Sequence, residues 1–302
     1  MSEPISQSVS DHAGELAITA ELSSLLSLAL FEDVGSGDVT SLAAIPAKLR
    51  GEGRLFSKAS GVLCGCNVAR RVARLVDPRI KIDFQMKDGA PLHPDDVIAW
   101  VRGPMRSILT AERVMLNFLQ HMSGVASLTR QYVDKLREAG SDIEVVDTRK
   151  TTPIWRKLEK YAVRVGGGGN HRYALYDMYL VKNNHIDAAG GIRAVLERIG
   201  KHNAKSRLKV AVEARNLDEV EEILDCGADL IMLDNMSTDD IKKAADLIGD
   251  AAMTEITGGV QLDTIAQYAD LPVNRISIGA LTHSAPALDI SLHVEQVEEN
   301  QQ

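Results

Sequence analysis

Residues 208–234 have the sequence LKVAVEARNLDEVEEILDCGADLIMLD, and this stretch decides the fold. A short β-branched strand ends at Glu213, a helix begins after the capping residue Asn216, and a second strand ends at Asp234. From Glu213 onward the strand ends recur at intervals of 21, 23 and 22 residues, at Asp234, Thr257 and Gly279. Such near-constant spacing predicts sequential β/α units whose parallel strands close toward a barrel.

The same pattern extends to both sides of this stretch. Further strands are predicted at 143–147, 178–182, 252–256 and 274–279, and another helix begins after Ser237. After the repeat, PALDISLHVEQ (286–296) alternates apolar and polar positions and predicts one more strand, which we expect to return to the N-terminal half of the chain.

The N-terminal half has a different pattern. Leu22–Phe31 predicts a helix, which ends in the glycine-containing loop of residues 32–41. Between Gly51 and Gly103, short runs of β-forming residues and the turn at Asp88-Gly89 predict a small antiparallel sheet.

A helix with one apolar face follows this sheet. A break is predicted at Ser123-Gly124, and a second helical run continues to Arg137. Arg113 lies just before the apolar face, and on pattern alone a solvated surface arginine is its simplest interpretation. The apolar face consists of Val114, Met115, Phe118, Leu119 and Met122.

The composition is that of a globular chain of 302 residues, with 45% hydrophobic residues and a net charge of −8. An acidic chain disfavours nucleic acid as its partner. No apolar run reaches the roughly 18 residues of a membrane span, and the N-terminus lacks a secretion signal, so a cytoplasmic protein is expected. Cys64, Cys66 and Cys226 are a poor zinc set and are expected to be reduced thiols.

Positive charge gathers in residues 147–186, DTRKTTPIWRKLEKYAVRVGGGGNHRYALYDMYLVKNNHI. Cations at this density beside four glycines favour a pocket for small anions over a solvated face. A flexible connector is the alternative interpretation of GGGGNHR (166–172). The cationic and imidazole side chains are Arg149, Lys150, Arg156, Lys157, Arg164, His171, Arg172, Lys182 and His185.

Ligands of β/α barrels bind where the C-terminal ends of the strands meet. In this sequence, the rule predicts that three cations, three carboxylates and two glycine turns lie together at the C-terminal end of the barrel. Arginine can grip a carboxylate or phosphate with two parallel bonds, lysine supplies a point charge, and the carboxylates suit sugar hydroxyls or water on a divalent ion. Any one strand-end acid could be only a helix cap. The set consists of Asp147, Arg149, Lys150, Lys182, Glu213, Asp234, Thr257-Gly258-Gly259 and Gly279-Ala280.

Several ordered motifs identify a family resemblance. DTRKTTP, LEKYAV, GGGGNHR, DMYLVKNNHI, GADLIMLDNM, ITGGV and SIGALTHSAPALDISL resemble those of quinolinate phosphoribosyltransferases, also called carboxylating nicotinate-nucleotide pyrophosphorylases. EDVGSGDVTS and LTAERVMLNFLQHMSGVA resemble the N-terminal half of that family. The resemblance covers all but the first twenty or so residues.

The resemblance implies an α/β fold, with an N-terminal α/β open-faced sandwich and a C-terminal incomplete, TIM-like β/α barrel. Residues 1–20 are expected to be a flexible tail and 21–122, joined by 285–302, the sandwich. Residues 123–284 would form the barrel.

The resemblance also implies a reaction. Quinolinate attacks the anomeric carbon of 5-phosphoribosyl 1-pyrophosphate (PRPP), with Mg²⁺ present. Pyrophosphate and CO₂ leave, and nicotinate mononucleotide results, a step of NAD biosynthesis. A homodimer is implied, with association into hexamers left open.

Roles carried over by position follow from the same resemblance. Arg149, His171, Arg172 and Lys182 would hold the quinolinate carboxylates, and Arg113 would enter from a neighbouring subunit. Lys150 would lie at the pyrophosphate and pyridine, and Glu213 and Asp234 at the ribose hydroxyls and the water shell of the metal, with no direct metal ligand expected. Thr257, Gly258 and Gly279 would lie at the 5′-phosphate, and Gly259 and Ala280 beside them. The expected catalytic set is Lys150, Lys182, Glu213 and Asp234.

The chain departs from the family pattern at two places. Ile154-Trp155 stands where the family usually has Gly-Leu after TTP, and Gly169 adds a fourth glycine before NHR. A related enzyme with a different carboxylated acceptor is therefore an alternative. A Schiff-base aldolase using Lys182 and a phosphometabolite-binding protein are weaker alternatives.

Overall fold

The computed structural model describes residues 14–297, so most of the predicted N-terminal tail lies outside the described residues. The chain forms two compact units. Unit 1 comprises residues up to Ser127, Arg164–Gly166 and the segment from Pro286; unit 2 comprises Leu128–Val163 and Gly167–Ala285. The predicted boundaries at 122 and 285 remain a proposal for the domain limits.

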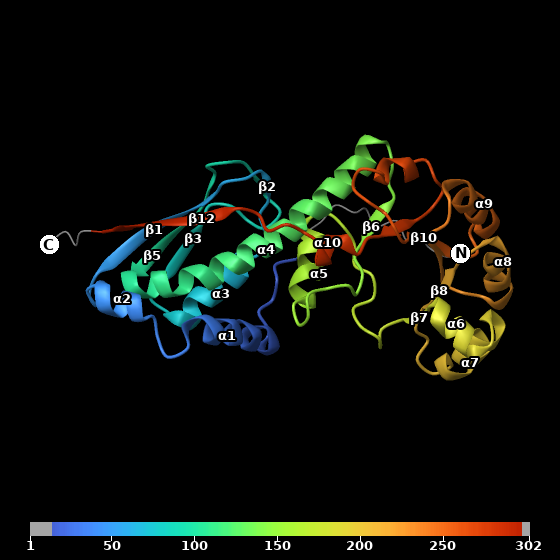
Figure 1. Cartoon of the computed structure of the whole chain (residues 1–302), viewed down its shortest axis with the longest axis horizontal. Coiled ribbons are helices and arrows are strands. Elements are labelled where there is room, and N and C mark those ends of the chain that lie inside the picture. Colours follow the sequence, from blue (N-terminus) through green and yellow to red (C-terminus); the bar gives the residue numbers. More distant parts are fainter. Residues whose placement is uncertain (1–13, 298–302) are drawn as a thin grey trace, which may run out of the picture. The chain divides into compact units, whose positions relative to one another are not determined.

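Unit 1 is built on an antiparallel sheet in the order β12-β1-β5-β3 (Figure 1). The strands are β1 (Arg50–Ser57), β3 (Lys81–Phe84), β5 (Val97–Pro104) and β12 (Ile290–Gln296), and β2 (Gly61–Val62) pairs separately with β4 (Pro91–Leu92). β12 pairs with β1 from Gly51↔Gln296 to Ser57↔Ile290. The predicted return of the last strand to the N-terminal sheet is therefore confirmed.

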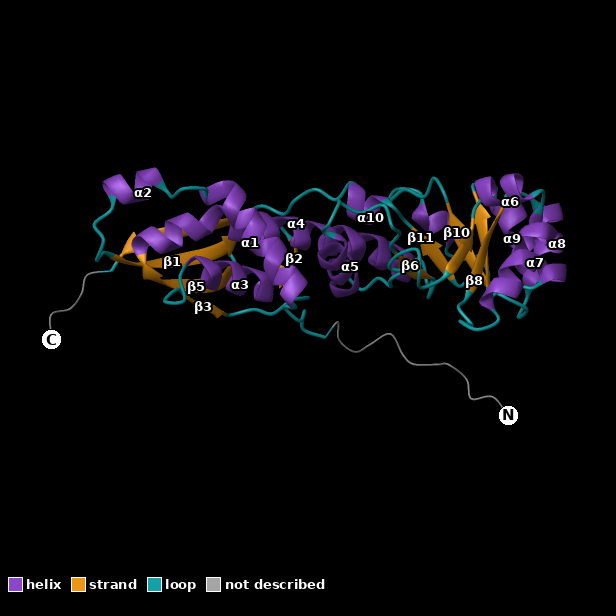
Figure 2. Ribbon diagram, turned by 90° about the horizontal axis from the view of Figure 1, so that it is seen from below, coloured by secondary structure: helices purple, strands orange, loops and turns teal. Residues whose placement is uncertain are grey.

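Helices cover one face of this sheet (Figure 2). They are α1 (Ala20–Val34), α2 (Val39–Ala44), α3 (Cys66–Val76) and the first part of α4 (Met105–Glu138). Ala73 of α3, Val101 of β5 and Ile108 of α4 share one buried cluster. The register places Glu52 opposite Arg102 on the other face, where the two side chains form an exposed ion pair at 2.8 Å. One apolar and one polar face make this an open-faced sandwich.

The sequence interpretation missed two helices of unit 1. α3 occupies residues that were assigned to no element, although Val68, Ala69, Val72 and Ala73 are buried at helical spacing. Within the predicted loop 32–41, Gly35 and Gly37 have positive φ as expected of turns, but Asp38 caps α2 by accepting a hydrogen bond from the Ser41 amide at 2.9 Å. The segment before α1 is also packed, because Leu16 is buried and its carbonyl accepts a hydrogen bond from Asn67.

The predicted break at Ser123-Gly124 was wrong, because α4 is one continuous helix of 34 residues. These small residues serve close packing instead. The hydroxyls of Ser123 and Ser127 accept hydrogen bonds from the amides of Cys64 and Val62 at 2.9 and 2.8 Å. A β-carbon on Gly124 would lie 2.0 Å from the carbonyl oxygen of Pro286. The predicted apolar face of the helix is buried throughout.

Unit 2 is a six-stranded parallel sheet in the order β6-β11-β10-β9-β8-β7. The chain starts at β6, crosses to the far edge at β7, and then adds strands in sequence until β11 pairs with β6. No pairing joins β6 to β7 among the described residues, so the barrel is incomplete. The strands are β6 (Glu144–Val146), β7 (Tyr179–Val181), β8 (Val210–Ala214), β9 (Leu230–Asp234), β10 (Met253–Thr257) and β11 (Arg275–Ser277).

Helices follow the strands as the sequence predicts, and α6 to α9 lie along the outer side of the sheet (Figures 1 and 2). Asn216 caps α8 and Ser237 caps α9, each accepting from a backbone amide three residues on. In the described residues 14–297, no helix is long and apolar enough to cross a membrane. The helical elements of unit 2 are α5 (Arg156–Val165, whose last two residues fall in unit 1), α6 (Asn183–Ala189), α7 (Ile192–Asn203), α8 (Leu217–Cys226), α9 (Thr238–Ile248), η1 (Ile265–Tyr268) and α10 (Ala280–His283).

Two helical glycines should respond to alanine in opposite directions. Gly124→Ala forces a β-carbon into the Pro286 backbone and should lower the free energy of unfolding by about 1–3 kcal/mol. Gly200→Ala, inside α7 with nothing within 4 Å of the added atom, should raise it by about 0.5–1 kcal/mol through helix propensity. Urea unfolding followed by circular dichroism measures both, and shifts of the two midpoints in the same direction would contradict this packing.

Candidate active site

The strand register places the predicted site residues on one face of the sheet of unit 2. Asp234 is paired with Thr257 across β9 and β10, and Glu213 is paired with Met232 across β8 and β9. Paired residues of parallel strands project to the same side, and alternate residues along a strand share a face. Glu213, Asp234 and Thr257 therefore converge at the C-terminal ends of three neighbouring strands.

Polar contacts join the ends of β7, β8 and β9. The ammonium of Lys182, directly after β7, forms an ion pair with Glu213, which is buried. The backbone amide of Asn183 donates to the same carboxylate at 3.3 Å, and its side-chain amide donates to Asp234 at 3.2 Å. The ammonium of Lys182 is about half exposed, so it is held in place yet accessible to a ligand.

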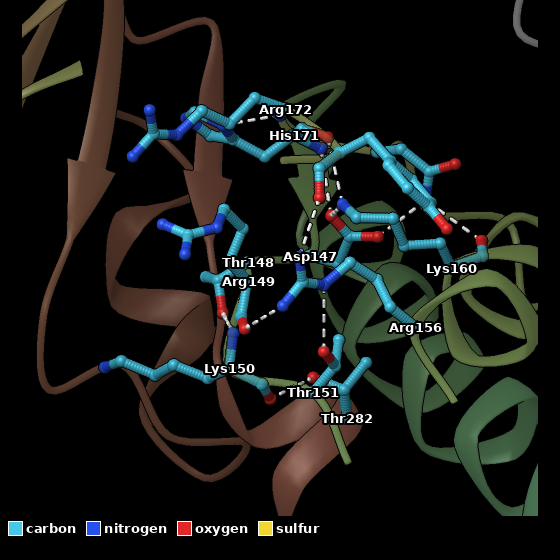
Figure 3. A network of polar contacts seen from close by, with 12 residues as sticks. Asp147, Thr148, Arg149, Lys150, Thr151, Arg156, Lys160, His171, Arg172 and Thr282 are labelled. Carbon is cyan, nitrogen blue, oxygen red and sulfur yellow. Dashed lines mark hydrogen bonds and ion pairs between the residues drawn. The ribbon is translucent and has the colours of Figure 1, made fainter. Parts of the chain in front are cut away.

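A buried carboxylate fixes the cationic stretch. Asp147, at the end of β6, accepts hydrogen bonds from the ammonium of Lys160, from the side-chain amide of Asn170 at 2.6 Å and from the amide of His171 at 2.9 Å (Figure 3). Lys160 also donates to the His171 carbonyl at 2.9 Å. Burial raises the pKa of Asp147 and lowers that of Lys160, and each partner opposes the shift of the other. GGGGNHR is therefore an anchored loop, not a flexible connector.

The side chains of Arg149, Lys150 and Arg172 extend in the same direction from this anchored region (Figure 3). Arg172 is half-buried and donates to the Met178 carbonyl at 3.1 Å. Burial lowers its pKa, and the neighbouring positive charge of Arg149 lowers it further. Nε of Arg149 is buried and has no hydrogen-bond partner among the described residues. The guanidiniums of Arg149 and Arg172 are therefore close enough to repel each other, and a buried N–H donor of Arg149 has no acceptor among the described residues.

His171 is buried beneath these cations as a neutral imidazole. Burial, together with the positive charges of Arg275, Lys160 and Arg172, lowers its pKa to about 3. Nδ1 accepts the amide hydrogen of Arg172 at 2.7 Å, so the ring proton is on Nε2. Nε2 lies 3.5 Å from a carboxylate oxygen of Glu255. His171 therefore orients the backbone of Arg172 and contributes no positive charge at neutral pH.

The glycine turns lie where the strand pattern predicts. Gly258 and Gly259 have φ of 89° and 63°, and a β-carbon on Gly258 would lie 2.5 Å from the side chain of Asn235. Asn235 itself has a φ of 55°, and its amide donates to the Thr257 carbonyl at 2.9 Å. A β-carbon on Gly279 would lie 2.8 Å from Cδ of Lys150. The first turn requires glycine because of its positive φ and the contact with Asn235, whereas a side chain on Gly279 would have to displace the flexible side chain of Lys150.

The sequence interpretation missed a buried ion pair between the neighbouring strands β10 and β11. Glu255 of β10 is fully buried and accepts from Nε of Arg275 in β11 at 2.6 Å. Burial raises the pKa of Glu255, and Arg275 opposes this rise. The available signal was an acidic residue in the middle of one apolar strand and a basic residue at the start of the next.

Most of the predicted site residues belong to unit 2, and one belongs to unit 1. Arg113 is exposed on α4, in unit 1. The predicted functional roles of all these residues remain proposals. Those gathered in unit 2 are Arg149, Lys150, His171, Arg172, Lys182, Glu213, Asp234, Thr257, Gly258, Gly259, Gly279 and Ala280.

Family models account for nearly the whole described chain. The model of the quinolinate phosphoribosyl transferase C-terminal domain matches residues 125–293, and that of the N-terminal domain matches residues 38–123. The chain belongs to the quinolinate phosphoribosyl transferase family.

Individual relatives agree with the family assignment. The chain is 39% identical over 283 residues to the probable nicotinate-nucleotide pyrophosphorylase (carboxylating) of Bacillus subtilis, covering 92% of this chain and 96% of that one. The crystal structure of NadC from Streptococcus pyogenes is similar with a TM-score of 0.90 and 41% identity, covering 95% of this chain and 100% of that one. The nicotinate-nucleotide pyrophosphorylase structure from Francisella tularensis has a TM-score of 0.88 and 35% identity, covering 95% and 100%.

The two departures from the family pattern have distinct structural consequences. Ile154 is 77% exposed and has a φ of 63°, a left-handed conformation that disfavours β-branched residues and suits the glycine usual there. Gly169 extends β6, because it bridges Val146 and its amide donates to the Val145 carbonyl at 2.8 Å. A β-carbon there would lie 2.0 Å from the Glu144 carboxylate.

Neutral His171 should make stability depend on pH. Its pKa in the folded protein is about 3, below the usual value of 6.5, so acid protonates the unfolded chain first and stability falls between pH 6.5 and 3. Between pH 7 and 5 the loss from this side chain, which is 5% exposed, should be about 2 kcal/mol. Urea unfolding of His171→Asn at both pH values should show a smaller loss than wild type.

The exposed His93 provides the control for this measurement. His93→Asn should retain the pH dependence of wild type. Equal losses between pH 7 and 5 in wild type and His171→Asn would show that the imidazole is not held neutral in the folded protein.

Proposed function

We propose that the C-terminal end of the unit 2 sheet binds quinolinate and PRPP side by side and that the residues gathered there carry the family reaction. In that reaction the chain transfers the phosphoribosyl group to quinolinate with decarboxylation, giving nicotinate mononucleotide, CO₂ and pyrophosphate. The proposal rests on one observation above all: the buried, unpartnered donor of Arg149 beside the guanidinium of Arg172. A buried donor without an acceptor is costly, and a carboxylate would satisfy it.

Quinolinate matches this arrangement because it carries two adjacent carboxylates. In the proposal Arg149 and Arg172 each bind one carboxylate through parallel N–H bonds, and the exposed ammonium of Lys182 adds a third donor. His171 fixes the Arg172 backbone, so that its guanidinium is oriented before the substrate arrives. Lys182 is ion-paired to Glu213, whereas a Schiff-base lysine must be uncharged to attack a carbonyl, which disfavours the aldolase alternative.

The activated ribose is assigned to the adjacent strand ends. Glu213 and Asp234 accept hydrogen bonds from the ribose hydroxyls, while Lys150 contacts the pyrophosphate. The turns at Thr257-Gly258-Gly259 and Gly279-Ala280 receive the 5′-phosphate against backbone N–H groups.

The chemistry requires stabilised charge and no catalytic base. The anomeric carbon becomes cationic as pyrophosphate leaves, and in the proposal the carboxylates of Glu213 and Asp234 stabilise it. Ribosylation leaves the pyridinium nitrogen positive, so the ring accepts the electron pair left at C2 when CO₂ departs. Fixed charges in a site that excludes water stabilise both states.

A magnesium ion fits this site as a companion of PRPP. In the described residues, no group of three or more His, Cys, Asp and Glu side chains could hold a metal ion. Two carboxylates, those of Glu213 and Asp234, suit Mg²⁺, which keeps several waters and takes its other ligands from substrate phosphates. When bound, the ion would neutralise charge on the departing pyrophosphate.

We propose a homodimer in which Arg113 enters the site of the other subunit. Unit 1 exposes an apolar patch formed by Leu28 and Phe31 of α1 with Val39 and Leu42 of α2, each more than half exposed. A cavity of about 460 Å³ opens at this patch and is lined by Thr110 of α4. Arg113 follows Thr110 by three residues and so projects from the same face of α4. A second copy of the chain would cover the apolar surface and receive the arginine.

A cytosolic location is also part of the proposal. It is supported by Cys64 and Cys66, which are buried free thiols whose pKa is raised by burial, as suits a reducing compartment.

Removing Arg149 should weaken quinolinate binding. Arg149→Ala leaves a substrate carboxylate without its partner, and the loss should be about 2–5 kcal/mol. Calorimetric titration with quinolinate and the release of CO₂ in the presence of PRPP measure the effect. The exposed Arg198→Ala, on α7, serves as the control and should match wild type. Wild-type affinity in Arg149→Ala would remove this residue from the site.

Mixing two inactive variants should restore activity if the site is shared. Arg113→Ala and Lys182→Ala homodimers should each be inactive, because every site lacks one group. In a mixed dimer one of the two sites is intact, so random reassociation should recover about a quarter of wild-type activity. The double variant Arg113→Ala/Lys182→Ala, reassociated with itself, is the control. Absence of recovery in a mixture shown to contain heterodimers would refute the shared site.

A further inference from the structure

A patch of three arginines lies on α3 of unit 1, well away in sequence from the residues assigned to catalysis. Arg70, Arg71 and Arg74 are three or four residues apart in the pairs 70–74 and 71–74, so their side chains occupy one face of the helix. The opposite face is buried through Val68 and Val72. We call Arg70, Arg71 and Arg74 the α3 arginine patch.

The patch has no acidic partner among the described residues. Arg71 donates twice to the Ser23 hydroxyl, at 3.1 and 2.8 Å. Arg70 donates to the Asn67 side-chain carbonyl at 2.9 Å and stacks over the Phe84 ring at 4.8 Å. Arg74 is exposed.

Several other arginines of the chain are neutralised by a carboxylate. Arg79 pairs with Asp77, Arg102 with Glu52 and Arg275 with Glu255. The chain carries 42 acidic residues against 34 basic ones, so carboxylates are abundant elsewhere. Like charges three or four residues apart destabilise a helix. The three arginines repel one another without a neighbouring carboxylate. This arrangement is expected when an anionic ligand supplies the negative charge.

The patch faces a hollow large enough for a small molecule. A cavity of about 660 Å³ is lined by Ile18, Thr19, Ala20, Ser23, Asn67 and the three arginines, none of them acidic. The first turn of the 15-residue helix α1 opens into it at Ala20. The positive end of the helix dipole therefore adds to the field of the guanidiniums. Hydrogen bonds to Ser23 and Asn67 restrict the side chains of Arg71 and Arg70, so less side-chain freedom is lost on binding.

We propose that the α3 arginine patch binds a small anion with two or more phosphate groups. Three guanidiniums offer forked donors to several phosphate oxygens, whereas a lone carboxylate would use only one fork. The volume is in the range of small-molecule pockets, and every lining residue belongs to unit 1. The site shares no residue with those assigned to quinolinate and PRPP, and the proposal does not depend on that assignment.

Calorimetry with inorganic tripolyphosphate tests the proposal. Wild type should show two classes of binding event per chain, one at the strand ends of unit 2 and one at the patch. Arg70→Gln/Arg71→Gln/Arg74→Gln should lose one class and keep the other. A control with equal charge loss on α7, Arg193→Gln/Arg198→Gln/Lys201→Gln, should keep both. ATP in a parallel titration should bind the same class, because the polyphosphate group carries the recognition.

The single variant Arg74→Gln provides a second test that remains informative if the triple variant does not fold. Arg74 is exposed and makes no contact that the fold needs, and its loss should weaken the patch class by about tenfold. A wild-type titration with one class of site, or unchanged stoichiometry and affinity in the folded arginine variants, overturns the proposal. CO₂ release from quinolinate and PRPP should be unchanged in Arg74→Gln, so failure at the patch is distinguishable from failure of the proposed catalytic site.

Discussion

The buried carboxylate of Asp147 is the contact on which the proposed site depends. It joins three parts of the chain that are separate in sequence: the end of β6, the ammonium of Lys160 in α5, and the loop that carries Asn170 and His171. Burying this ion pair is costly, and the loop amides that complete the set of hydrogen bonds offset that cost. Removing one partner would leave the other charge uncompensated, so this part of unit 2 holds a single arrangement.

The cations of the proposed site follow from that anchor. Arg149 lies two residues after Asp147, and Arg172 lies directly after His171, so the anchor fixes the two backbone positions from which the guanidiniums extend. Burial lowers the pKa of Arg172, and the neighbouring charge of Arg149 lowers it further, because partial burial limits the screening of that charge by solvent. In the proposed site, a dianionic substrate relieves the repulsion between these charges on binding, whereas a neutral one would not. Under this proposal, selectivity for a diacid follows from the two neighbouring guanidiniums.

Much of this architecture could be predicted from the sequence, because the β/α repeat sets both the strand ends and the face they share. Glu213, Asp234 and Thr257 were assigned by spacing alone, and the register of the sheet places them together. Charged residues inside strands were harder to interpret. Glu255 and Arg275 are stable in the sheet because they form an ion pair across two strands, and the sequence of either strand alone does not reveal its partner.

The N-terminal half was less predictable for a related reason. Ser123 and Gly124 have low helix propensity and suggested a break, yet their small size is what lets Cys64 and Pro286 approach α4. α3 was missed because its buried face relies on alanines and valines beside arginines that stay outside the core. In both helices, contacts with distant parts of the chain determine the structure, and the helix propensity of the local residues does not predict such contacts.

The pairing of β12 with β1 has a consequence for how the chain is made. Until Ile290 and the residues after it leave the ribosome, β1 has no neighbour on one side, and its backbone donors and acceptors from Gly51 to Ser57 remain open. All of unit 2 must be synthesised in that interval, which lasts on the order of 10 seconds or more at cellular elongation rates. An uncovered strand edge is a template for wrong pairing. The nascent chain therefore keeps an edge that is prone to wrong pairing until β12 emerges, and termination before Ile290 would release a protein in which this edge of β1 stays uncovered.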